Sequence, residues 1–85
     1  MSTAKAIANV MKGLGFPVIA YCEPDQEADG QIMVTPKHHI QVGADYVIAV
    51  REHPDGSYRF GTTFYHHRLG ACLLELKEHL ANHPA

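Results

Sequence analysis

Histidine and glutamate side chains near the end of this chain have a spacing that could bind a metal. Glu75, His79 and His83 recur every four residues, so a helix would place all three along one side. Carboxylate and imidazole groups in such a row can bind zinc or another divalent cation, although no cofactor is otherwise expected. The row borders a leucine stripe and lacks the HExxH pattern, so ordinary surface histidines are the competing interpretation.

Two adjacent histidine pairs, His38–His39 and His66–His67, belong to the seven histidines of the 85-residue chain. Neighbouring residues of a strand point to opposite faces, so an extended pair cannot offer both rings to one ion. We interpret both pairs as residues at the ends of elements. His66 and His67 would then lie at the entry to the last helix, where ring nitrogens could cap backbone groups or face water.

A β-hairpin is the clearest local signal in the sequence. Two runs with alternating apolar residues flank Pro54-Asp55-Gly56, which is typical of a three-residue turn with a bulge. If His53 faces Ser57 across this turn, one face of the hairpin is aromatic and branched and should face the core. Its pairs would be Val50 with Phe60, Ile48 with Thr62, and Tyr46 with Phe64.

The opposite face of this hairpin would place Arg51 against Arg59. Two like charges directly opposite each other are unfavourable unless an anion shares the site. With Arg68 and the aromatic ring of Tyr65 nearby, the pair is a candidate anion or nucleic-acid site. The competing interpretation is that both arginines extend into water, where surface charges contribute little to stability.

Two helices and three to five strands are predicted around this hairpin. Apolar residues at helical spacing predict helices over residues 3–14 and 67–82, and residues 17–23 and 30–35 have the composition of strands. Residues 38–45 are either a short strand or an irregular segment. The predicted fold is α+β in the order α-β-β-(β)-β-β-α, with both helices packed on one face of an antiparallel sheet.

Length and composition predict one small domain over residues 1–85, with 46% hydrophobic residues and a net charge of −2. No apolar run approaches the length of a membrane span. Two cysteines 50 positions apart favour a reducing cytoplasm over a disulfide scaffold. A net charge of this sign does not attract nucleic acid to the chain as a whole.

A protein interface is the remaining candidate site. A domain of this size buries only about 60% of its unfolded surface, so a second copy would add stability. Leu74 lies opposite the leucine stripe of the last helix, and Val47 and Ala49 lie on the predicted uncovered sheet face. We therefore expect a binding or assembly module rather than an enzyme, forming a homo-oligomer or joining a larger complex. Alternatives are anion or nucleic-acid binding, and a histidine-based metal-binding or pH-responsive protein.

The helix–strands–helix order resembles the double-stranded RNA-binding domain in topology. That resemblance would imply RNA binding through a basic second helix. The matching segment here, "HHRLGACLLELK" at residues 66–77, has Arg68 as its only early cation, and residues 23–30, "EPDQEADG", are acidic where the family has a phosphate-binding loop. Acidic groups repel a phosphate backbone, so the resemblance does not extend to the chemistry.

Overall fold

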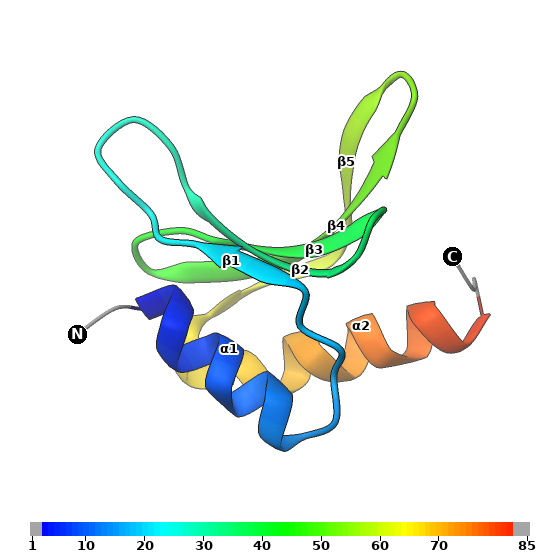
Figure 1. Cartoon of the computed structure of the whole chain (residues 1–85), viewed down its shortest axis with the longest axis horizontal. Coiled ribbons are helices and arrows are strands. Elements are labelled where there is room, and N and C mark those ends of the chain that lie inside the picture. The colour runs from blue at the N-terminus through cyan, green and yellow to red at the C-terminus, as the bar shows by residue number, and fades with distance from the viewer. Residues whose placement is uncertain (1–2, 83–85) are drawn as a thin grey trace.

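Two α-helices lie on the same face of a five-stranded antiparallel sheet (Figure 1). The computed structural model describes residues 3–82, apart from the side-chain surroundings of positions 57, 58 and 61. The elements are α1 (Thr3–Gly13), β1 (Ala20–Cys22), β2 (Gly30–Thr35), β3 (His38–Val42), β4 (Tyr46–His53), β5 (Gly56–Tyr65), the short 3-10 helix η1 (His66–Arg68) and α2 (Leu69–Asn82). The α+β prediction is confirmed, and the ambiguous third segment is a strand.

The two ends of α1 are capped by different interactions. At the C-terminal end, the N–H of Phe16 donates to Met11 O at 3.0 Å and that of Gly15 to Lys12 O at 3.1 Å, which is the Schellman pattern. Gly15 has a φ of 93°, a conformation that favours glycine. At the N-terminal end, the Glu23 carboxylate accepts the N–H of Ala4 at 2.8 Å, where a negative charge also complements the helix dipole.

The strands follow one another in sequence order, β1-β2-β3-β4-β5, so every neighbour is antiparallel and joined by a short connection. The β1–β2 loop and the tip of the β4–β5 hairpin both bend away from the helices, which makes the helix-free face concave (Figure 1). Side chains on a concave face cover one another. Ile48 and Val50 are buried there without any helix above them.

The core lies between the helices and the other face of the sheet. Its buried members are Ala4, Ile7, Ala8 and Met11 from α1; Ile32, Val34, Ile40, Val42, Val47 and Ala49 from the sheet; and Cys72, Leu73 and Leu76 from α2. The apolar stripes of both predicted helices are therefore confirmed, with one exception: Leu14, which the helical spacing assigned to the stripe, is 64% exposed.

The predicted phase of the β4–β5 hairpin is wrong. His53 pairs with Gly56 across a two-residue loop, so Ala49 rather than Val50 lies opposite Phe60. A shift of one residue in a strand exchanges its two faces. A register irregularity between Val47 and Ala49 then places Val47 opposite Phe64. The face of β4 that packs against the helices is thus the one expected to be bare.

Candidate functional site

An apolar groove runs between the turn after α1 and the helix α2. Two adjoining pockets, about 180 and 200 Å³ in volume, share Leu14, Phe16 and Lys77 in their lining. The remaining lining residues are Gly15, Pro17, Gly70, Leu73, Leu74 and Leu80. The Schellman turn after α1 creates the groove, because it brings Phe16 back toward the core while Leu14 stays at the surface.

Two leucines are unusually exposed along this groove. Leu14, in the turn after α1, is 64% exposed, and Leu74, on α2, is 57% exposed. Single exposed leucines are ordinary, but two at the border of one apolar groove form a continuous apolar surface. The groove is therefore the strongest candidate for a protein-binding surface. Leu74, singled out from the sequence as an interface residue, lies within it.

The other two predicted interface residues lie elsewhere. Val47 is fully buried and Ala49 is 1% exposed, and both pack in the core under the helices. Their expected position on a bare sheet face is wrong because the hairpin has the opposite phase. These two side chains therefore cannot contact a partner in the folded chain.

The four residues of the predicted anion site do not gather at one place. Arg51 lies on the helix-covered face, because it follows Val47 and Ala49 at alternate positions, whereas Arg59 pairs with Val50 on the concave face. The guanidinium of Arg68 lies 5.9 Å from the ring centroid of Phe64, within cation–π range. Tyr65 stacks on His67 with 5.8 Å between ring centroids. The expected pairing of the two arginines is wrong.

The predicted metal row is only partly within the described chain. His83 lies outside the described residues. The carboxylate of Glu75 accepts the backbone N–H of Thr62 at 3.0 Å, and the His79 ring stacks on Phe60 with 3.9 Å between centroids. Within residues 3–82, no group of three histidine, cysteine, aspartate or glutamate side chains could hold a metal ion.

The pair His38–His39 does split between the two faces, as alternation along a strand requires. His38 is buried beneath α2, and His39 is buried on the concave face, where its Nδ1 lies 3.6 Å from Oε1 of Glu52. Burial lowers the pKa of His39, and the nearby Glu52 carboxylate partly opposes that shift. Both histidines are therefore held neutral within the fold near pH 7.

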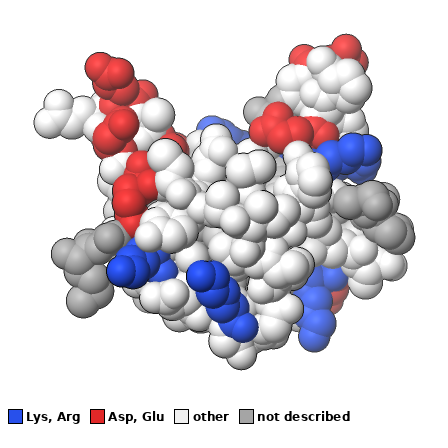
Figure 2. All heavy atoms as spheres, viewed as in Figure 1, with Lys and Arg blue, Asp and Glu red and all other residues white. Residues whose placement is uncertain are grey.

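The concave face is bordered by acidic side chains. Figure 2 shows aspartate and glutamate on the two arms that flank this face, with lysine and arginine mostly on the helix side. On one arm, Asp25 accepts the N–H groups of Glu27 and Ala28, both at 2.8 Å, and these bonds lower its pKa. Asp29 accepts the Tyr46 hydroxyl and the Gln41 amide. The borders of this face are therefore negatively charged.

His66 and His67 have different roles at the entry to α2. Nε2 of His66 lies 3.0 Å from Gly43 O and 3.1 Å from Tyr46 O, so it donates to two backbone carbonyls and ties the β3–β4 connection to the helix entry. His67 is exposed and stacks on Tyr65. Of this pair, it is thus His66 that binds backbone groups, and these groups belong to the β3–β4 connection rather than to the helix.

Replacing His66 with alanine should lower the free energy of unfolding by about 1–3 kcal/mol, because the hydrogen bonds of its ring to two backbone carbonyls are lost in a half-buried position. The matched change His67→Ala should cost much less, since it removes only a surface stacking contact. Urea unfolding of both variants, followed by circular dichroism, measures the difference. Equal losses would contradict the assigned hydrogen bonds.

The two thiols are free but differ in surroundings. Cys22 is exposed, and Cys72 is buried in the core. Burial raises the pKa of Cys72 to about 12, with a smaller contribution from Glu75. A thiol with so high a pKa is almost never a thiolate at neutral pH, so Cys72 has the character of a packing residue rather than a nucleophile.

Sequence reasoning missed most of the groove and the surroundings of His38. Leu14 fitted the helical stripe, and only Gly15 signalled that the helix ends just before it. Phe16 and Lys77 carried no local signal, because their contact depends on how the turn after α1 packs against α2.

Comparisons with protein-family models, with curated proteins and with solved structures found no match to this chain. Within the described residues, no helix is long and apolar enough to cross a membrane.

Proposed function

We propose that this protein is an assembly module that forms a homodimer through the groove between the turn after α1 and α2. The single observation that carries the proposal is the continuous apolar surface formed by Leu14 and Leu74 over the groove. Burying apolar surface contributes about 25 cal/mol per Å² removed from water, so pairing two such surfaces is favourable. A small core gains most from this addition.

A second copy fits this surface better than an unrelated partner. Leu74 lies near the middle of α2, so a two-fold axis beside it would bring the same leucine of both copies together, as in an isologous interface. Gly70, one turn earlier on the same side, has nothing within 4 Å of the position of a Cβ atom. It leaves room for the aliphatic stem of Lys77 from the opposite copy.

Nucleic-acid binding is the less favoured alternative. The arginines expected to form its site lie on different faces, and acidic arms border the concave side of the sheet. We place the assembly function in the cytoplasm, because an exposed and a buried free thiol are typical of a reducing compartment. Joining a larger complex through the same groove is the other form that this proposal can take.

Changing Leu74 to glutamate tests the proposal. The wild-type chain at micromolar concentration should elute as a dimer in gel filtration with light scattering, and Leu74→Glu should be a folded monomer. The proposed two-fold axis would bring the two introduced carboxylates close together, where like charges repel each other. Ile19→Glu is the matched control, because Ile19 is 59% exposed but does not line the groove, and this variant should remain dimeric.

A monomeric wild-type protein would contradict self-association. Dissociation of the Ile19 variant together with the Leu74 variant would show that the groove is not the interface. Circular dichroism of each variant separates loss of assembly from loss of folding. A wild-type dimer that survives Leu74→Glu would place the contact on another surface.

A further inference from the structure

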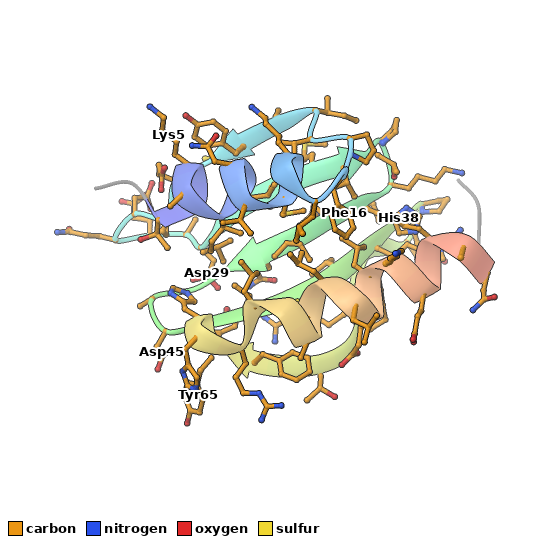
Figure 3. The ribbon with its side chains drawn as sticks, turned by 90° about the horizontal axis from the view of Figure 1, so that it is seen from below. Lys5, Phe16, Asp29, His38, Asp45 and Tyr65 are labelled. Carbon is orange, nitrogen blue, oxygen red and sulfur yellow. The ribbon has the colours of Figure 1, made fainter. Side chains whose placement is uncertain are left out.

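A cluster of rings lies between the sheet and the C-terminal half of α2, centred on His38 (Figure 3). The centroid of the His38 ring is 5.3 Å from that of His79 on α2 and 6.3 Å from that of Phe60 on β5. His38 is only 1% exposed. Its register partner on β4 is Arg51, so the imidazole and the guanidinium project from the same face of neighbouring strands.

The hydrogen bonds around His38 indicate which ring nitrogen carries the proton. The hydroxyl oxygen of Thr35 accepts the N–H of Lys37 at 3.1 Å and lies 2.9 Å from Nδ1 of His38. A hydroxyl has one proton to donate, and Nδ1 is an acceptor within reach. When the hydroxyl donates to Nδ1, the neutral ring carries its own proton on Nε2, which makes that nitrogen a donor.

Two buried donors in this cluster lack an acceptor. Nε2 of His38 and Nε of Arg51 are both buried, and neither has a hydrogen-bond partner within the described part of the chain. Arginine remains charged in proteins, so its Nε–H is always a donor. Buried donors almost always have a hydrogen-bond acceptor. Because His38 and Arg51 are register partners on neighbouring strands, one acceptor group could bind both nitrogen atoms.

The charges that face His38 are all basic. Lys37 lies in the turn before β3, Arg51 and His53 come from β4, and His79 comes from α2. Burial and then these neighbours lower the pKa of His38. The carboxylate of Glu52 lies on the other face of the sheet, beside His39. Among the described residues, the charged groups that act on the pKa of His38 therefore give the cluster a positive potential.

We propose that Nε2 of His38 and Nε of Arg51 form the base of a binding site for a small oxyanion such as phosphate. A tetrahedral oxyanion presents several acceptor oxygens and a charge that the surrounding basic groups stabilise. Arg51, His53 and His79 are each partly exposed, so the proposed site lies close to solvent at the margin of the sheet. The protein would contact only oxygen atoms, so free phosphate and the phosphoryl group of a larger molecule share this chemistry.

Imidazole nitrogen signals provide the direct test. ¹⁵N-labelled wild-type protein at pH 7 is titrated with inorganic phosphate and, in parallel, with glycerol 3-phosphate, while sodium chloride keeps the ionic strength constant. The His38 Nε2 signal should move saturably while that of His67 does not. At ten times the dissociation constant, Tm should rise by about 5–10 °C. Response to both ligands indicates a phosphoryl site, and response to phosphate alone indicates a free-anion site.

The two arginines of the β4–β5 hairpin supply a matched pair of variants. Arg51→Gln should weaken phosphate binding by about tenfold or more, the value of a lost charged hydrogen bond. Arg59→Gln removes the same charge from the opposite face and should leave the affinity unchanged. Equal effects of the two variants, or a His38 signal that does not respond saturably to either ligand, would overturn the proposal. The wild-type titration decides the matter even if Arg51→Gln does not fold.

Discussion

Replacing Gly43 with alanine should destabilise the protein by about 3 kcal/mol, the upper end of the usual cost of overpacking. A Cβ atom at this position would overlap the ring of Tyr46. That ring cannot move freely, because its hydroxyl donates to Asp29 and accepts from the Gln41 amide at 2.9 Å. Urea unfolding monitored by circular dichroism measures the loss.

The backbone of Gly43 adds to this expected cost. Its N–H donates to Tyr46 O at 2.8 Å, and its carbonyl accepts from His66 at 3.0 Å, so a shift of the backbone would strain three segments at once. Gly13→Ala is the control, since nothing lies within 4 Å of its Cβ position at the end of α1. It should stabilise the chain by about 0.5–1 kcal/mol. Similar stabilities of the two variants would contradict the described packing of Tyr46.

The helices and most strands could be predicted because their signals are local. Apolar residues at helical spacing, such as Ile7 with Met11 and Leu73 with Leu76, indicate which side of a helix is buried wherever the helix lies. The two-fold alternation of strands is equally local. The fold class depends only on the order of these elements, so the sequence predicted it without any knowledge of contacts.

The face of β4 could not be predicted, because it depends on the exact length of one turn. Pro54-Asp55-Gly56 is compatible with a two-residue or a three-residue loop, and the choice shifts the register by one. β4 is also apolar at five successive positions, residues 46–50, and both of its faces are buried. An uninterrupted apolar run gives no alternation from which to read the inward face.

The candidate sites depend on contacts between segments that are distant in sequence. The spacing of residue types along the chain does not indicate such contacts. His38 looked like one of a histidine pair at a strand end, yet its surroundings come from β2, β4, β5 and α2. The groove likewise combines the turn after α1 with the exposed side of α2. Leu74 was identifiable because an exposed apolar residue on an amphipathic helix is a local anomaly.

Acid should destabilise the protein well above the range in which carboxylates titrate. In the fold, the pKa values of His38 and His39 lie below the ordinary value of 6.5, chiefly because both rings are buried. The basic neighbours of His38 lower its pKa further, whereas Glu52 partly raises that of His39. Below about pH 6.5 the unfolded chain therefore binds more protons than the folded chain, so stability falls as the pH falls.

The expected slope is large for so small a protein. Each histidine that is protonated only on unfolding contributes about 1.4 kcal/mol per pH unit, so the two together approach about 3 kcal/mol per unit between pH 6.5 and their folded pKa values. Urea unfolding in phosphate-free buffers from pH 8 to pH 5 measures this dependence. His38→Gln should remove about half of the slope, and His67→Gln, at an exposed position, should leave it unchanged.

Phosphate should weaken this acid sensitivity if it binds beside His38. An anion in contact with Nε2 favours the protonated ring, so it raises the pKa of the folded state toward that of the unfolded chain and reduces the difference in bound protons. The slope should therefore fall when saturating phosphate is added to the wild type but not to Arg51→Gln. A stability that does not change between pH 8 and pH 5 would mean that neither buried histidine is held neutral by its surroundings.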